Sequence, residues 1–388
     1  MTDRPDRPDR PIQGGVEGTL IRGGTSRGLF CREDELPPAG PVRDALLVEL
    51  FGSPDPIQVD GIGGGESHTS KAMIVEPSDR DGADVAYTFG QVEVDTPTVA
   101  WGANCGNLTA AIGVYALREG MVPAREPRTD LTLYNTNTGT TVEQSVPVRG
   151  GEPDVYGEHA VDGVPGTGAR VDSTFVDPAG PDGAFPTGDR REAVVTDDGE
   201  YEVTILDVTN PNVFVRASDL GLSGTELPAA IEADADLMAR IERVRGAAAA
   251  RLGYVEDPAD AAAESPERPF LQLIAPPASY DRSTGGRVEA SGIDVTGRIM
   301  SNGHPHHAYA MTGAMCLGAA AHLDGTVPAA VAGPVDGEVR IGHPKGTITV
   351  GTDVVDGRVA GVTMRRTARP LFQGTVYHRY VDDLASLR

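Results

Sequence analysis

The chain has 388 residues, and its 57 acidic residues outnumber its 33 lysine and arginine residues to give a formal net charge of −24. This acidic excess argues against nucleic acid as a partner, because phosphate binding requires clustered basic side chains. The length predicts two domains, since single hydrophobic cores stop growing beyond roughly 250 to 300 residues. Only two of the basic residues are lysines, Lys71 and Lys345. Such an acidic, lysine-poor composition indicates adaptation to high salt, which screens self-repulsion.

The N-terminal sequence repeats Asp-Arg-Pro and has no apolar segment of the kind found in signal peptides. We therefore expect a disordered leader over residues 1–14 and a cytoplasmic protein. Three cysteines, Cys31, Cys105 and Cys316, are too few and too scattered for a disulfide framework. The longest apolar stretch, residues 308–323, is too short and too rich in Gly and Ala to cross a bilayer, so we expect no membrane association.

Along the chain, short runs of alternating apolar and polar residues predict strands of antiparallel sheets, at 85–94, 130–148, 200–209, 339–355 and 357–366. Two segments are apolar almost all round, which predicts buried helices over 106–120 and 306–323. A more amphipathic segment near 228–252 predicts a surface helix. Each half of the chain thus resembles strands wrapped on one helix. The Gly, Pro and Asp-rich stretch from about 150 to 200 is where we expect the chain to pass between the halves.

Two glycine-rich segments lie near the N-terminus. In "RGGTSRG", residues 22–28, the arginines with Thr25 and Ser26 suit carboxylate binding. The segment "GIGGGESHTSK", residues 61–71, matches neither the dinucleotide fingerprint nor the P-loop, so we interpret its glycines as allowing a ligand close to the backbone. Lys71 ends this segment. A desolvated lysine can lose its proton whereas arginine cannot, so Lys71 indicates proton chemistry. The alternative is a lysine retained by chance on a surface turn.

A small polar cluster precedes each predicted buried helix, residues 104–107 in one half and 304–307 in the other. Helix starts carry unpaired N–H groups, so two that face each other would form a cleft for a molecule with several carboxylates. Cys105 is then either a reactive thiol at a helix start or an inert buried one. Cys316 lies inside its predicted helix, which favours a core thiol. The histidines of "HPHHAY" have no acidic residue or cysteine beside them, so we expect no metal site.

Eight motifs, taken together and in this order, resemble the 2-methylaconitate cis-trans isomerase (PrpF-like) family over nearly the whole chain: "IRGGTSRG", "DGIGGGESHTSKAMIV", "ANCGNLTAAIG", "DPAG" with "FPTG", "DVTNPNVFV", "HHAYAMTGAMC", "IGHPKG" and "RTARPLFQG". The resemblance implies an α+β, diaminopimelate-epimerase-like fold. Its two pseudo-symmetric domains would each be a β-barrel-like sheet around a central buried helix, with the active site between them and no cofactor. The implied domains are residues 15–187, joined by a C-terminal return strand over 370–388, and residues 188–369.

The resemblance also implies residue roles. Lys71 matches the lysine that exchanges the proton, and Cys105 matches the second acid/base group. The implied substrate-binding residues are Arg22, Thr25, Ser26, Gly64, Gly65, Ser70, Asn104, Gly106, Asn107, His306, His307 and Thr312. Arg27 stands where the family pattern has lysine, which argues against a proton-transfer role there. The "HPHHA" cluster occupies the place of a second catalytic cysteine in diaminopimelate epimerase, which argues against two-thiol racemisation.

These features predict a cofactor-independent isomerase that moves a proton on an unsaturated di- or tricarboxylate. The first expectation is 2-methylaconitate cis-trans isomerisation in propionate metabolism. The alternatives are an allylic shift of the double bond, in methylitaconate or oxalomesaconate, and, from another class, a non-catalytic accessory protein for an aconitase-like enzyme. We expect a small-molecule carboxylate as the ligand and a possible homodimer.

Overall fold

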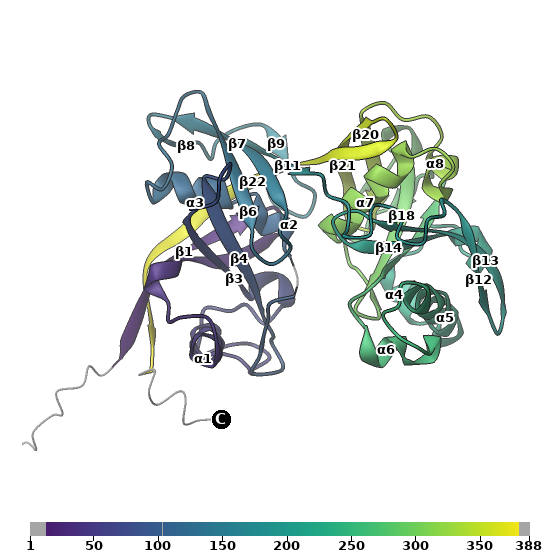
Figure 1. The fold of residues 1–388 in the computed structure, drawn as a ribbon, viewed down its shortest axis with the longest axis horizontal. Helices are drawn as coiled ribbons and strands as arrows, with labels where there is room; N and C mark the ends of the chain where they lie inside the picture. Colours follow the sequence, from purple (N-terminus) through teal and green to yellow (C-terminus); the bar gives the residue numbers. More distant parts are fainter. Residues whose placement is uncertain (1–12, 103, 380–388) are drawn as a thin grey trace, which may run out of the picture.

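The computed structural model describes residues 13–102 and 104–379, which form two lobes (Figure 1). Nearly all of the leader expected over residues 1–14 lies outside the described residues, as do residues 380–388 of the expected return strand. Gly14 is the first residue of β1.

The first lobe is built on a closed ring of eight strands. Each strand pairs with the next, and the last pairs with the first. In ring order they are β1 (Gly14–Gly23), β2 (Ser26–Arg32), β3 (Lys71–Pro77), β4 (Val85–Val92), β6 (Arg128–Asn135), β7 (Thr141–Arg149), β11 (Arg170–Val176) and β22 (Arg358–His378). The apolar helices α2 (Gly106–Thr109) and α3 (Ile112–Arg118) pack against strands of this ring, and α1 (Pro41–Phe51) packs beside β4 and β22.

The second lobe contains seven longer strands, besides the two-residue strands β16 (Tyr280–Asp281), β17 (Arg287–Val288) and β19 (His304–Pro305), and meets the first lobe through β22. The longer strands are β12 (Glu192–Thr196), β13 (Gly199–Asp207), β14 (Pro211–Arg216), β15 (Phe270–Ala275), β18 (Val295–Ser301), β20 (Glu338–His343) and β21 (Gly346–Val355). Its helices are α4 (Pro228–Glu232), α5 (Ala235–Arg251), α6 (Ala261–Glu264), α7 (Met311–His322) and α8 (Val327–Ala332). Ten of the twelve residues of α7 are buried, because this helix has apolar residues on every face.

The two lobes repeat one order of strand pairing. From β1 to β11 and again from β13 to β22, successive neighbours are antiparallel, parallel, antiparallel, parallel, antiparallel and antiparallel. In each lobe the buried helix lies between the fourth and fifth strands of this order. The sheets that were expected to be antiparallel are therefore mixed, with two parallel pairs in each lobe. Parallel neighbours need long crossovers, which local alternation of residues does not reveal.

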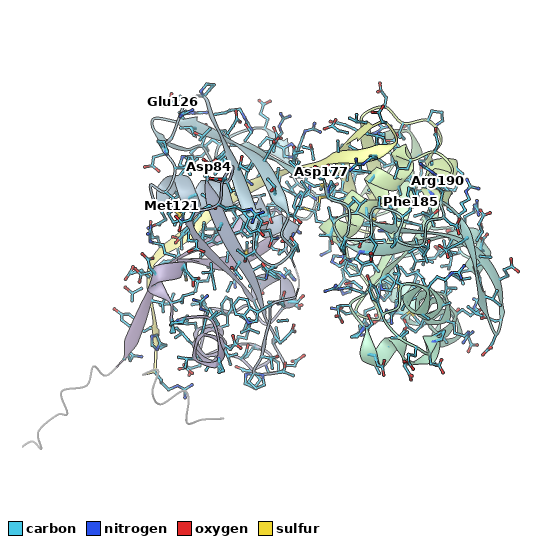
Figure 2. The ribbon with its side chains drawn as sticks, in the orientation of Figure 1. Asp84, Met121, Glu126, Asp177, Phe185 and Arg190 are labelled. Carbon is cyan, nitrogen blue, oxygen red and sulfur yellow. The ribbon has the colours of Figure 1, made fainter. Side chains whose placement is uncertain are left out.

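The chain passes between the lobes twice. Strand β22 pairs with β21 in the second lobe, then with β11, and over residues 368–378 with β1 in the first lobe. It is the yellow strand that joins the lobes in Figure 1. The other passage lies between β11 and β12. Figure 2 shows Asp177 where the lobes meet, whereas Phe185 and Arg190 lie on the second lobe with the Arg190 guanidinium 4.9 Å from the Phe185 ring.

The helix boundaries differ from those predicted. The helix expected over 306–323 begins at Met311, because His306 donates its backbone N–H to Ile299 and extends a hairpin of β18 with β19 (His304–Pro305). The helix expected over 106–120 is divided into α2 and α3. The segment 228–252 forms two helices, because Asp234 caps the N-terminus of α5 through its side chain.

Candidate active site

The glycine turn between β1 and β2 contacts the start of α2. Thr25 Oγ1 accepts a hydrogen bond of 3.2 Å from the Asn107 amide. Gly24 has a φ of +49°, and a Cβ atom there would lie 2.2 Å from Asn107 Oδ1, so only glycine fits this turn. The Arg22 guanidinium donates to the backbone oxygens of Gly24 and Thr367 at 3.0 and 2.8 Å. These bonds hold the turn in place, a role that the sequence did not indicate for Arg22.

Cys105 lies at the N-terminus of α2 and is buried, with its Sγ atom 4.0 Å from the Ser26 hydroxyl. Beside it, the side-chain Oδ1 atom of Asn104 is buried and has no hydrogen-bond partner among the described residues. A Cβ atom on Gly106 would lie 2.1 Å from Met311 Cε, so the start of α2 touches the start of α7. The starts of α2 and α7 are therefore neighbours, although α7 begins at Met311 and not at the cluster 304–307, where the sequence predicted its start.

Lys71 is the first residue of β3 and is half-buried. Its Nζ atom donates a hydrogen bond to Oε1 of Gln91, the residue opposite it on β4, and lies 5.1 Å from the centre of the Phe89 ring. No carboxylate lies within ion-pair distance of Lys71 in the part of the chain that the structure describes. No hydrogen bond joins Lys71 to Cys105 among those residues. The backbone of Lys71 packs against β2, where its carbonyl contacts Gly28.

The loop before Lys71 is organised by one buried glutamine. Gln58 Oε1 accepts hydrogen bonds from the Gly65 backbone and from the buried Ser70 hydroxyl at 2.9 and 2.6 Å. A Cβ atom on Gly63 would lie 2.1 Å from the same oxygen, and one on Gly64 would lie 2.7 Å from the Arg27 guanidinium. Gly63 and Gly64 thus allow a close approach of protein side chains, and the approach of a ligand to this backbone stays a prediction.

In the second lobe, His306 and His307 lie in the segment before α7, and Thr312 lies in its first turn. His306 and His307 are exposed, and Thr312 accepts a bond from Thr209 through its carbonyl. Neighbouring protein atoms partly desolvate the His306 ring. This desolvation, helped by His307 and Lys345, lowers the His306 pKa to about 4.

The structure adds residues that sequence reasoning missed. Burial lowers the pKa of His68, whereas the negative charge of Glu66 raises it. The positive charges of Lys345, Lys71 and Arg27 lower it further. Both lysines of the chain therefore act on one histidine, although Lys345 lies on the turn between β20 and β21 in the second lobe. The scarcity of lysine, which drew attention to Lys71, applies equally to Lys345.

A cavity of about 350 Å³ lies between the lobes. Thr25, Asn107 and Arg366 line it from the first lobe, and Ala308, Tyr309 and His343 line it from the second. Arg366 is the first residue of the "RTARPLFQG" motif, and its type and spacing alone indicate no role for it. Lys71 and Cys105 do not line this cavity.

The remaining groups have simpler roles. Cys31 and Cys316 are buried free thiols, and burial raises the pKa of Cys31 to about 12. The Cys316 thiol donates to the Leu206 carbonyl at 3.5 Å. Within residues 13–102 and 104–379, no group of three His, Cys, Asp or Glu residues is arranged to hold a metal. The helices in the same ranges are all too short or too polar to cross a membrane.

Comparison with known proteins decides the family, because residues 13–379 match the family described as PrpF protein. The chain belongs to the PrpF family. It is 40% identical over 387 residues to the 2-methyl-aconitate isomerase of Shewanella oneidensis, covering 94% of this chain and 97% of the relative. It also resembles a solved methylitaconate-delta-isomerase, with a TM-score of 0.87, 37% identity, and coverage of 95% and 97% of the two chains.

The fold extends beyond the PrpF family. A hydroxyproline epimerase from Agrobacterium vitis matches 94% of this chain and 92% of its own with a TM-score of 0.50 and 16% identity. The epimerase-like fold that the resemblance to the PrpF-like family implied is thus confirmed at the level of a mixed α/β structure with an eight-stranded, barrel-like sheet. The expectation that the chain is an isomerase of the PrpF family is confirmed as well, and these relatives do not decide the exact reaction.

Proposed function

We propose that this chain is a cofactor-independent isomerase that moves a proton on an unsaturated di- or tricarboxylate. Among the reactions named for its relatives, we propose 2-methylaconitate cis-trans isomerisation first. The observation that carries the proposal is the environment of Lys71. This lysine is one of only two in the chain, and a neutral amide oxygen rather than a carboxylate accepts its hydrogen bond.

The proposed reaction begins with proton transfer. The amine form of Lys71 removes a proton from the saturated carbon next to the double bond, and the electron pair of that C–H bond spreads through the double bond into a carboxylate. In the resulting dienolate the former double bond has single-bond character, so rotation about it exchanges the cis and trans forms. Return of a proton to the same carbon, from Lys71 or Cys105, completes the isomerisation.

The same groups also permit an allylic shift. If the proton returns to the other end of the delocalised system, the double bond moves instead of rotating. Methylitaconate isomerisation and oxalomesaconate tautomerisation are reactions of this second kind. Positive charge around the junction, including Lys345 and the N-terminus of the twelve-residue helix α7, supports either course by stabilising the charge that develops on the carboxylate.

The test is proton NMR of the protein in D₂O with molar KCl. We would offer 2-methylaconitate, methylitaconate, oxalomesaconate and aconitate separately, to wild type, Lys71→Met and Lys71→Arg. Arg keeps the positive charge but cannot release its proton, so both variants should lose deuterium exchange and isomer conversion. Normal turnover by either variant would refute the role of Lys71.

The non-catalytic alternative predicts a different result from the same experiment. An accessory protein would bind tricarboxylates, detectable by a thermal shift, without exchanging deuterium on any compound. It would also be indifferent to Lys71→Met. Conversion of one acid, with loss of conversion in the variants, would reject that alternative and name the substrate.

Several accompanying assignments stay proposals. They are the division into residues 15–187 with 370–388 and residues 188–369, the pseudo-symmetric relation of the two domains, a cytoplasmic location, a homodimer and a role in propionate metabolism. We also propose adaptation to high salt, which the net charge of −24 supports. It predicts that the free energy of unfolding rises between 0.1 M and 2 M KCl, and an equal or lower value at high salt would refute it.

A further inference from the structure

Arg366 is a buried cation without an acidic partner. Only 8% of its surface is exposed, and no carboxylate of the described residues lies within ion-pair distance of it. Buried charges are normally paired, as Arg43 is with Glu33. Arg298 also lacks a carboxylate, but its guanidinium lies 4.8 Å from the Tyr280 ring. Arg366 has neither kind of compensation.

The bonds that Arg366 does make leave part of its guanidinium free. Nε donates to Asn107 Oδ1 at 3.3 Å, and Nη1 donates to the Arg365 carbonyl at 3.0 Å. Nη2 has no hydrogen-bond partner within the described part of the chain. Burial lowers the Arg366 pKa to about 10, which still leaves the side chain charged at neutral pH. The protein therefore keeps a desolvated positive charge next to Asn107.

This charge lies at the cavity between the lobes. The two carboxylates that line the cavity are already engaged, because Asp162 accepts a 2.6 Å hydrogen bond from the Thr347 backbone and Glu338 pairs with Arg365. Neither of these carboxylates lies within ion-pair distance of Arg366, so Arg366 faces the cavity without an acidic partner among the described residues. The cavity volume of about 350 Å³ falls in the range of small-molecule sites.

We propose that Arg366 binds one carboxylate of the substrate in this cavity, with Asn107 and Thr25 beside it. This inference rests on the proposed function and adds the residue that recognises an acid group away from the reacting carbon. A guanidinium can bind a carboxylate with two parallel hydrogen bonds, which a lysine cannot do. Because β22 belongs to both lobes, a carboxylate held by Arg366 contacts the segment that joins them.

The experiment measures binding rather than turnover. Tricarballylate is a saturated tricarboxylate, so it cannot undergo the reaction, and its Kd can be measured by calorimetry with wild type, Arg366→Gln and Arg366→Lys. Loss of a charge-assisted bond should raise the Kd roughly 10- to 100-fold in Arg366→Gln, with a smaller rise in Arg366→Lys. Arg43→Gln removes a buried arginine that does not line the cavity and should leave the Kd unchanged.

A second pair of variants keeps Arg366 and covers the case in which its replacement prevents folding. Ala308 lines the same cavity. Ala308→Asp adds a carboxylate that competes for Arg366, whereas Ala308→Asn adds a neutral group of the same size. We expect the Kd for tricarballylate to be at least 10-fold higher in the Asp variant than in the Asn variant.

The outcomes separate this inference from the proposed function. Equal Kd values for wild type and folded Arg366→Gln, equal values for the two Ala308 variants, or no tricarballylate binding by wild type would overturn the role of Arg366 even if wild type isomerises its substrate. Weakened binding in these variants, in a protein that exchanges no deuterium, would uphold Arg366 and refute the isomerase.

Discussion

The Nζ atom of Lys71 donates a hydrogen bond to Oε1 of Gln91, its directly opposite partner on β4. The Gln91 amide nitrogen donates in turn to the backbone oxygens of Ser67 and Ser70, so the acceptor has a fixed orientation. A neutral acceptor positions the lysine without adding a negative charge that would favour its protonated form. Gln91 is therefore a positioning residue for the proposed base.

Gln91→Leu should lower kcat by roughly 10- to 100-fold, because a misplaced catalytic group loses alignment with the substrate. Loss of the bonds from the glutamine amide should also lower the free energy of unfolding by about 1 to 2 kcal/mol. Steady-state kinetics and urea unfolding check the two effects. A variant that is less stable but has normal kcat would show that Gln91 supports only the loop.

Gln91→Glu is the matched variant, since it keeps an acceptor and changes only charge. A carboxylate here favours the protonated lysine, so the rate at neutral pH should fall below that of wild type while KM changes little. A rate equal to wild type would contradict the role of a neutral partner.

Gly24→Ala should weaken substrate binding. The added Cβ atom would meet Asn107 Oδ1 at 2.2 Å, and the φ of +49° strains any residue with a side chain. We expect a higher KM, because Asn107 contacts both Thr25 and Arg366, together with a loss of stability of about 1 kcal/mol or more. Gly120→Ala is the control, because Gly120 also has a positive φ but open space around it. A similar KM for both variants would contradict the prediction.

Lys345→Gln should raise the pKa of His306 above its value of about 4. The charge of Lys345 is one of the influences that lower this pKa, after desolvation and His307, so its removal makes protonation easier. The pKa of His68 should rise for the same reason. NMR titration of the histidine ring protons measures both. Lys345→Arg keeps the charge and should leave both values low, whereas unchanged values in Lys345→Gln would mean that Lys345 does not face these rings.

His343 should make the protein sensitive to acid. Its side chain is buried, and desolvation lowers its pKa from 6.5 to about 4. A depressed folded-state pKa stabilises the protein above pH 6.5, and this contribution is lost as the pH falls through 4. The shift corresponds to about 3 kcal/mol between these limits. The difference in unfolding free energy between wild type and His343→Gln should therefore be smaller at pH 4 than at pH 7. An equal difference at both pH values would contradict this assignment.

Local patterns predicted much of the fold because they depend on short-range periodicity. The strands near β4, β6, β7, β13, β20 and β21 and both buried helices were found in this way. Local patterns failed where a residue remote in the sequence decides the secondary structure or the direction of a neighbouring strand. His306 continues a hairpin instead of starting a helix because its N–H bonds to Ile299, and the parallel neighbours of β2 and β14 depend on crossovers.

The sequence by itself determined the family, through its ordered motifs, and it drew attention to Lys71 because lysine is so rare in this chain. Only the tertiary structure decided that Asn107 meets Arg366, 259 residues further along the chain, and that Lys345 acts on the same histidine as Lys71. The physical reason is that the desolvation of a charge and the identity of its neighbours depend on how remote segments pack. A motif records a residue's type and order but not the environment that folding gives it.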